Sequence, residues 1–443
     1  MWAIALPVLF AEVGETLIQF TDTALLGRVG TPELAAIGPI DAVVDMAIVP
    51  AVGIAEAMQI VVARRVGEGR ERPIGQTFGR ALGLVLVVSV AAAAALRLGA
   101  GPVGERVISS PAVAHAVEDF FRYGSLGIVP FALNLALASL WVGLGRTRVL
   151  VWATLVLVAV NLALSTALIF GIGGLPARGI EGAGIGFLGA EAAALALLGA
   201  QTVRRLGPGR REAARGQYAR PENGSRPHSD ASPGAIARLG APIGLQALVE
   251  ALRWVGFFLI VEQLGERPLA WSSVVFACFT LLLIPSQAFA ETAYTMVSGT
   301  LGRSPEARLG ALMRSVTRAA FLATLPLLVV AIAFPEAVLS VFTGSAGTVA
   351  GAAPSLRVVA AGMLLVVPAE LWLAALFGTG DSDAGFLVEV LTSGAMVAGC
   401  ALAVLAFDAV LPVVWAMLPL ASALGLAASA AWVRSRRWRR VGV

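Results

Sequence analysis

The sequence predicts an all-α integral membrane protein, and its composition, its long apolar runs and an internal repeat are the observations that predict it. Of the 443 residues, 58% are hydrophobic and 14% are charged, with a mean hydropathy of +0.84. Apolar runs of about 18 residues or more, which suffice for a bilayer-spanning helix, recur along the chain. A transmembrane β-barrel is excluded, because its strands would alternate polar and apolar residues in segments of about 10.

Twelve membrane-spanning helices are predicted, six in each half of the chain. They cover residues 2–27, 34–62, 78–100, 118–144, 149–172, 183–203, 236–264, 270–298, 312–334, 354–378, 384–406 and 410–433. The segment between the two sets is rich in Arg, Gly, Pro and Ser and has too few apolar residues for a packed core. We therefore expect an N-terminal lobe (1–203), a cytoplasmic linker (204–235) and a C-terminal lobe with a basic tail (236–443).

The second half of the chain repeats the first at an offset of 235 residues. The identical pairs at this offset include Pro7 and Pro242, Glu15 and Glu250, Gly143 and Gly378, and Gly145 and Gly380. Such a match of prolines, glutamates and glycines in one register indicates a duplication. Because each repeat holds an even number of spans, we expect the two lobes to be related by a pseudo-two-fold axis along the membrane normal.

Arginine placement predicts the orientation in the membrane. All 32 basic residues are arginines; 24 of them lie at the termini and in the loops of one face, and 7 lie on the opposite face. By the positive-inside rule, both termini and the linker are cytoplasmic. This topology also explains the sequence pI near 9.8, so we expect no nucleic-acid partner. We expect a multi-pass monomer in the cytoplasmic (inner) membrane of a bacterium.

A stripe of polar residues interrupts the first apolar span. Glu12, Glu15, Gln19 and Asp22 fall within an arc of roughly 80° on a helix. A carboxylate at mid-membrane costs on the order of 2.5–3.5 kcal/mol, so such groups normally face a bundle interior or a water-filled cavity. Loss of water raises the pKa of a carboxyl group, so the group can bind a proton when it is dry and release the proton when water returns. Structural hydrogen bonds for the glutamates, and headgroup water around Asp22, remain alternative interpretations.

The second span carries a further acidic stripe, formed by Asp41, Asp45, Glu56 and Gln59. These residues fall within roughly 60° of one another if Pro50 leaves the helical phase unchanged. If the two stripes face each other, they line an acidic cavity inside the N-terminal lobe.

Four charged residues are candidates for a substrate cavity or for an acidic site in the C-terminal lobe. Glu250 stands three residues before Arg253, so the two side chains can form a pair that lowers the cost of burying either one. A structural role and a functional role for this pair both remain open. Glu370 and Glu191 are further acids within apolar spans. The sequence holds no metal-ligand spacing of His or Cys, and we expect neither a metal nor a cofactor.

Several short motifs resemble those of the multidrug and toxic compound extrusion (MATE) transporters, and of their DinF-like branch in particular. They are Pro7 followed fifteen residues later by Asp22 in TDTALLGRVG, ELAAIG at the second span, the Gly-x-Gly turns from Gly143 and Gly378, Asn161, and GIEGAGIG from Gly179. The resemblance covers essentially the whole chain. It implies two six-helix lobes around a cleft, and an antiporter that exports amphipathic, often cationic, compounds in exchange for protons or sodium ions.

The resemblance also implies roles for single residues. Asp22 matches the aspartate that couples the ion in the DinF-like branch, and Asn161 matches a polar residue beside it. Glu250 matches a seventh-helix glutamate of the NorM-like and eukaryotic branches.

Three positions depart from the family's pattern. Ser165 stands where a second aspartate is frequent, Phe187 replaces a threonine, and Glu370 lies about one turn away from the position of a tenth-helix acid. The family's first-lobe ion site is therefore incomplete here.

The expected function is secondary active efflux by alternating access, without enzymatic activity and driven by an ion gradient. Protons are favoured over sodium because Glu12, Glu15, Asp41 and Asp45 can compensate for the incomplete site. A lipid-linked sugar flippase of the same superfold is an alternative, although it needs basic residues in its cavity, and Arg253 is the only clear mid-membrane arginine. A lipid-modifying membrane enzyme is a further alternative, which needs a convergent nucleophile or metal set.

Overall fold

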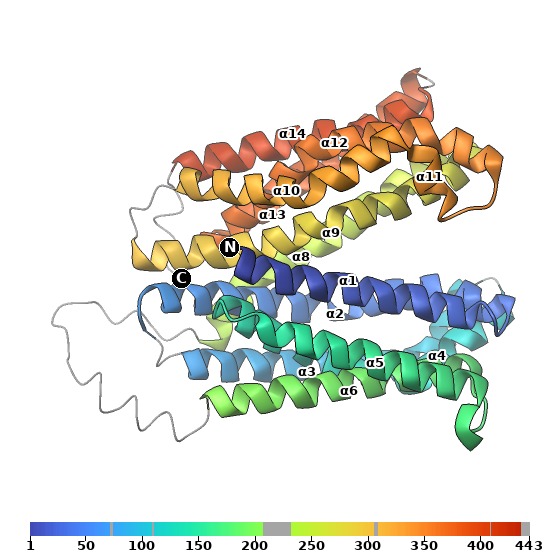
Figure 1. Ribbon diagram of the computed structural model, residues 1–443, viewed down its shortest axis with the longest axis horizontal. Helices are drawn as coiled ribbons and strands as arrows, with labels where there is room; N and C mark the ends of the chain where they lie inside the picture. Colours follow the sequence, from blue (N-terminus) through green and yellow to red (C-terminus); the bar gives the residue numbers. More distant parts are fainter. Residues whose placement is uncertain (71–73, 109, 207–231, 305–308, 408, 436–443) are drawn as a thin grey trace. The chain divides into compact units, whose positions relative to one another are not determined.

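The computed structural model describes residues 1–70, 74–108, 110–206, 232–304, 309–407 and 409–435 (Figure 1). Every regular element within these ranges is helical, and 12 helices are long and apolar enough to cross a membrane. The predicted fold class is thereby confirmed. Parts of two predicted segments, residues 207–231 of the linker and 436–443 of the basic tail, lie outside the described residues.

The twelve long helices follow the predicted spans. They are α1 (Trp2–Leu26), α2 (Thr31–Gly67), α3 (Ile74–Val107), α4 (Pro111–Gly143), α5 (Arg148–Phe170), α6 (Gly179–Leu206), α8 (Pro233–Glu262), α9 (Glu266–Arg303), α10 (Leu309–Ala333), α12 (Ala346–Gly378), α13 (Ser382–Phe407) and α14 (Leu411–Ser435). Two short elements were not predicted, the 3-10 turn η1 (Ile172–Gly174) and the helix α11 (Pro335–Ser340).

Several helices begin earlier than their apolar runs do. Both α4 and α8 start at a proline, Pro111 and Pro233, and α2 carries Pro32 in its first turn. A proline is favourable there because the first helical N–H groups have no partner in any case, and its fixed φ suits the helix. Hydropathy alone therefore placed these helix starts too late.

The chain forms two compact units, each assembled mostly from one half of the sequence. Unit 1 comprises Met1–Leu9 and Leu245–Val443, and unit 2 comprises Phe10–Gly244. The boundaries before Phe10 and before Leu245 are separated by 235 residues, the offset of the sequence repeat. Consequently α1 starts in unit 1 and continues in unit 2, whereas α8 starts in unit 2 and continues in unit 1.

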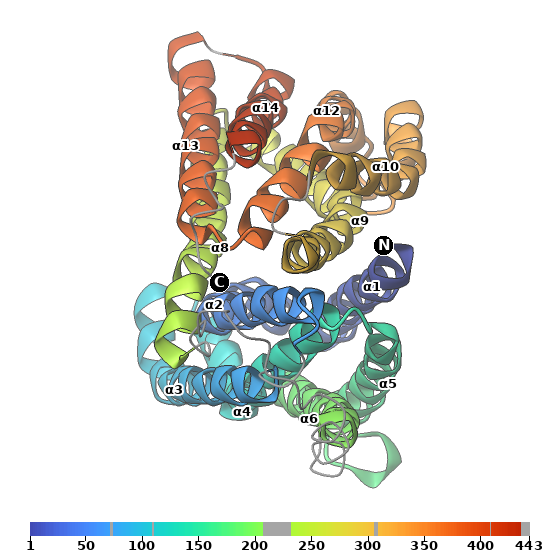
Figure 2. The same cartoon turned by 90° about the vertical axis from the view of Figure 1, so that its left-hand side faces the viewer.

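Both units use the same helix packing. In unit 2, α4 packs against α2, α3 and α6, and α5 packs against α6. In unit 1, α12 packs against α9, α10 and α14, and α13 packs against α14 (Figure 2). The fourth helix of each repeat is thus the central one, and residues along most of the length of α4 and α12 are buried.

The repeated glycines maintain this packing. A Cβ on Gly143 would lie 2.9 Å from the backbone oxygen of Gln59, and a Cβ on Gly378 would lie 3.0 Å from that of Tyr294, its counterpart in the repeat. Two residues later, Gly145 and Gly380 have φ values of 66° and 94°. Glycine adopts this left-handed region without steric cost. The duplication therefore preserved close helix contacts and the turns that follow them.

Candidate functional site

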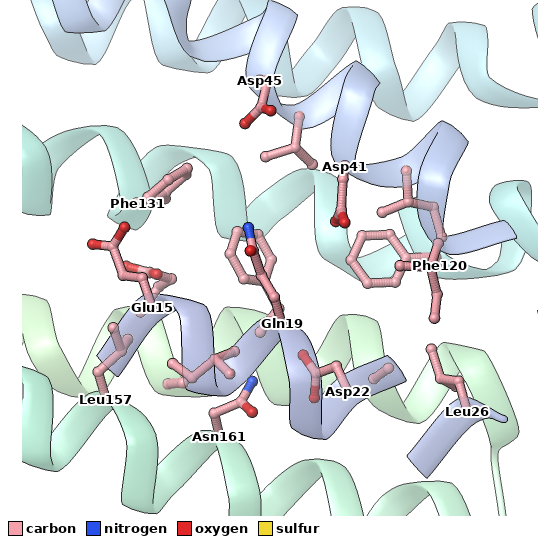
Figure 3. Close-up of a pocket in the computed structure, with 18 residues that line it drawn as sticks. Glu15, Gln19, Asp22, Leu26, Asp41, Asp45, Phe120, Phe131, Leu157 and Asn161 are labelled. Atoms are coloured by element: carbon pink, nitrogen blue, oxygen red, sulfur yellow. The ribbon is translucent and has the colours of Figure 1, made fainter. Parts of the chain in front are cut away.

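An acidic cavity of about 160 Å³ lies within unit 2, among α1, α2, α4, α5 and α6 (Figure 3). Its polar lining consists of Glu15, Gln19, Asp22, Asp41, Asp45, Asn161 and Glu191. None of the described residues that line it is basic. The cavity therefore concentrates five carboxylates without a cation from the protein to balance them.

The two predicted acidic stripes face each other across this cavity. Glu15, Gln19 and Asp22 project from successive turns of α1, and Asp41 and Asp45 project from α2 (Figure 3). Residues at i, i+4 and i+7 share one face of a helix, which is why the sequence pattern placed them together. The expectation that both stripes line one cavity is confirmed for these residues.

Asp22 of α1 and Asn161 of α5 are neighbours in the polar lining. Asn161 is only 2% exposed, and its side chain lies within hydrogen-bonding reach of the Asp22 carboxylate. Asp22 Oδ1 and Asn161 Oδ1 are both buried without a hydrogen-bond partner among the described residues. Buried acceptors are normally satisfied, so two of them in one place indicate a position for a proton or another cation.

Glu191 extends the acidic lining onto α6. Its side chain is 5% exposed, and Asn134 Nδ2 donates to Glu191 Oε2 at 2.7 Å and to the Glu191 backbone oxygen at 2.8 Å. The Glu191 carboxylate also lies close enough to Glu15 for the two charges to repel each other. The structure therefore places Glu191 in the same cavity as the α1 stripe.

Three phenylalanines form an aromatic wall in the cavity. Phe187 stacks on Phe120, with ring centroids 6.3 Å apart, and meets the edge of Phe131 at 5.9 Å. All three line the cavity. Aromatic faces carry partial negative charge and attract cations, so this wall complements the carboxylates.

Some residues expected at the site are not among those that line the cavity. They are Glu12, Glu56 and Gln59, which make other contacts. Ser165, which departs from the family's pattern, does not line the cavity either. Glu12 lies one turn before Glu15, beyond the end of the cavity. Ser165 is fully buried and packs closely against α6, where a Cβ on Gly186 would lie 3.1 Å from the Ser165 Cα.

Unit 1 contains a second cluster of charged residues, which is compact and paired. Arg253 Nη2 lies 2.9 Å from Glu250 Oε1, so the predicted pair is confirmed, and Arg253 Nη1 lies 3.1 Å from Glu389 Oε1. Ser393 Oγ donates to Glu389 Oε1 at 2.7 Å. The sequence analysis missed Glu389, although an acid inside the apolar α13 is the same kind of signal as Glu370 in α12.

The space around this second cluster is small. The cavity there has a volume of about 20 Å³ and is lined by residues of α8, α9, α12, α13 and α14, including Glu370. The Arg253 guanidinium also lies 5.5 Å from the ring centroid of Trp254. In the described ranges of both units, no three or more His, Cys, Asp and Glu side chains are grouped so as to hold a metal ion.

Sequence similarity to known proteins extends over both halves of the chain. The MatE family model matches residues 7–166 and 242–404. The protein named probable multidrug resistance protein NorM of Geobacillus kaustophilus is 28% identical over 301 residues, which are 66% of this chain and 63% of that protein. Its namesake from Rhizobium meliloti is 28% identical over 267 residues, which are 60% of this chain and 55% of that protein. Each match thus spans less than two thirds of the relative.

Solved structures share the fold along nearly the whole chain. An outward-facing multidrug resistance MATE family transporter of the MOP superfamily aligns with a TM-score of 0.86 at 17% identity, covering 98% of this chain and 94% of that one. A MOP superfamily transporter from Pyrococcus furiosus gives the same values. The family match covers more than half of the residues, in both repeats, and includes most of the acidic cavity. The chain belongs to the MatE family.

Proposed function

We propose that this protein is an efflux antiporter of a bacterial cytoplasmic membrane that exports amphipathic organic cations in exchange for protons by alternating access. The observation that carries the proposal is the cavity of unit 2, which gathers five carboxylates and no basic residue. Five carboxylates around one cavity repel one another, so cations that enter the cavity are favoured there. Protons and a cationic substrate can each neutralise these carboxylates, so the two compete for the same cavity.

Asp22 is the proposed coupling residue. Its buried Oδ1 and the Oδ1 of Asn161 lack donors among the described residues, and a proton on Asp22 supplies one. Ser165, which stands where the family resemblance implies a second aspartate, packs against α6 at Gly186. Without that second aspartate, the position beside Asn161 offers sodium fewer oxygen ligands than the family pattern implies, which favours a proton.

The aromatic wall supports a cationic and partly apolar substrate. Phe120, Phe131 and Phe187 offer ring surface beside the acids of α1 and α2, so one compound can contact both. The relatives named as probable multidrug resistance proteins support the export of small organic compounds. We further propose a monomer with cytoplasmic termini, in keeping with the arginine distribution.

The cavity lining weighs against the flippase alternative. A site for a pyrophosphate-linked sugar needs basic residues, whereas the described lining of the unit 2 cavity has none and Arg253 is paired with two glutamates. The proposed role is therefore transport of cations.

Dye transport into proteoliposomes tests this function. The full chain is reconstituted, and accumulation of a fluorescent cationic dye is followed with a proton gradient or a sodium gradient imposed separately. We expect the proton gradient to drive transport and Asp22→Asn to reduce it by about tenfold or more, because the variant cannot exchange a proton at this position.

The matched control is Asp383→Asn, the same chemical change at an exposed acid in the first turn of α13. It should transport like the wild type. If only the sodium gradient drives transport, or if Asp22→Asn equals Asp383→Asn, the proposed coupling is wrong.

A further inference from the structure

The cavities of the two units differ in charge at the equivalent positions 18 and 253. Arg253 follows Ile18 by the 235-residue offset of the repeat, and each of the two residues lines the cavity of its own unit. The preceding acids, Glu15 and Glu250, are identical at the same offset and line the same two cavities. One repeat therefore presents an apolar side chain where the other presents a guanidinium.

Carboxylates from three helices surround the guanidinium of Arg253. Its two Nη atoms contact Glu250 of α8 at 2.9 Å and Glu389 of α13 at 3.1 Å, and Glu370 of α12 lines the same space. Arg253 is 6% exposed. A planar guanidinium that contacts two carboxylates through its separate N–H groups is held in a defined orientation.

Unpartnered polar atoms identify the remaining space as part of a polar site. Arg253 Nε and Ser429 Oγ are both buried without a hydrogen-bond partner among the described residues, and both residues line the 20 Å³ cavity. A space of this size is enough for one water molecule. The cavity beside the guanidinium is therefore polar, and Arg253 Nε and Ser429 Oγ can each still form a hydrogen bond there.

We propose that Glu250, Glu370 and Glu389 form a site for a guanidinium-type cation and that Arg253 is its resident, tethered occupant. Because the occupant is covalently attached, the site in unit 1 exchanges no free cation. Ion exchange is then confined to the cavity of unit 2, a consequence that rests on the proposed antiport function. The site itself does not depend on that function.

Removal of the tethered cation tests the site directly. We replace Arg253 by Ala in the full chain and follow thermal unfolding of the purified protein while guanidinium chloride is added in the low millimolar range. Urea, which is planar and neutral, and sodium chloride at matched ionic strength are the controls. The vacated site should bind free guanidinium.

The midpoint of unfolding of Arg253→Ala should rise saturably with guanidinium, by about 1.5 °C at ten times the dissociation constant. Urea should not raise it, and wild type should respond to neither compound. The double variant Arg253→Ala with Glu389→Gln should lose the response, because it lacks one of the two carboxylates that contact the guanidinium group in the wild type. A response to guanidinium that does not exceed that to urea, or an equal response in wild type, overturns the proposal.

A second variant keeps the test decisive if Arg253→Ala does not fold. Arg253→Met keeps most of the packing of the arginine side-chain stem but carries no charge. It leaves the carboxylates without a cation, so sodium chloride should stabilise it more than an equal concentration of N-methylglucamine chloride. Equal effects of the two salts would contradict the proposal. Both experiments measure stability and not transport. A failure of the cation site can therefore be distinguished from a failure of the antiport function, which the dye-transport assay tests.

Discussion

The two units apply one helix arrangement to opposite electrostatic situations. Unit 2 has an open cavity of about 160 Å³ whose described lining holds five carboxylates and no base. In unit 1 the equivalent helices surround about 20 Å³, where Arg253 pairs with Glu250 and Glu389. Duplicated scaffolds can thus keep their packing and differ at the residues that decide whether a cavity is available to an ion.

Different steric limits at the packing positions and at the cavity positions account for this pattern. Gly143 and Gly378 make the same close contact in their respective units, where any side chain would meet a backbone oxygen. Position 18 and position 253 face cavities, where isoleucine and arginine both fit. Helix packing therefore tolerates little change, whereas a single cavity residue can alter the chemistry of a unit.

Loss of one carboxylate from the unit 1 cluster is expected to have the largest effect on stability. Glu389→Gln leaves the buried Arg253 with Glu250 as its remaining ion pair among the described residues, and breaking a buried pair costs about 3–5 kcal/mol. Denaturant unfolding of the purified protein measures this loss. The control is Glu336→Gln, which breaks the exposed pair with Arg357 of similar length, 3.2 Å, and should cost about 0–1 kcal/mol. Equal losses of unfolding free energy in the two variants would show that the ion pair of Arg253 and Glu389 contributes no more to stability than an exposed pair does.

Transfer of the charge to the other unit is the next test. Ile18→Arg places a guanidinium beside Glu15 in the open cavity, where it should act as a tethered cation and lower proton-driven dye transport about 100-fold, or about 2.7 kcal/mol. Initial rates in proteoliposomes measure the effect. Ile18→Met, which keeps the position apolar, should transport like wild type. If a folded Ile18→Arg variant transports dye at the wild-type rate, an arginine at this position does not block cation exchange, and the proposed difference between the two cavities is wrong.

The shared packing predicts similar effects in both units. Gly143→Ala and Gly378→Ala should each destabilise the protein by about 1–3 kcal/mol, because the added Cβ would lie 2.9 Å or 3.0 Å from a backbone oxygen. Gly83→Ala on α3, where nothing lies within 4 Å of an added Cβ, is the matched control. Unfolding midpoints decide the matter, and an effect in one unit alone would show that the contacts are not equivalent.

The smallest expected effect concerns the aromatic wall. Phe187→Leu removes a ring that contacts both Phe120 and Phe131, and loss of a cation–π contact of about 0.5–1 kcal/mol should raise the KM for a cationic dye roughly two- to fivefold. Phe407→Leu, at a residue 72% exposed in unit 1, is the control. An unchanged KM would remove the wall from the substrate site.

Patterns along single helices were predictable, because they depend on local spacing. Hydropathy identified the twelve spans, the helical period placed Glu15, Asp22 and the α2 acids on facing stripes, and a separation of three residues indicated the pair of Glu250 and Arg253. The same local reasoning included Glu12, which the cavity does not reach. A helical stripe gives the direction of a side chain but not where a cavity ends.

Contacts between distant segments were not predictable from one sequence. Arg253 and Glu389 are 136 residues apart, and Asn134 and Glu191 are 57 apart, so neither partnership leaves a trace in local spacing. The wall formed around Phe187 likewise depends on how α4 and α6 pack. Tertiary packing decides which of several buried acids are paired and which remain available.

Proton release on substrate binding tests most directly whether the ion is exchanged in the cavity of unit 2. Purified protein in weakly buffered solution is titrated with a cationic dye while a pH indicator records the protons released. Wild type should release about one proton per dye bound, and Asp22→Asn should bind dye with much less release, because its side chain carries no exchangeable carboxyl proton. Equal proton release by the two proteins would contradict exchange at Asp22.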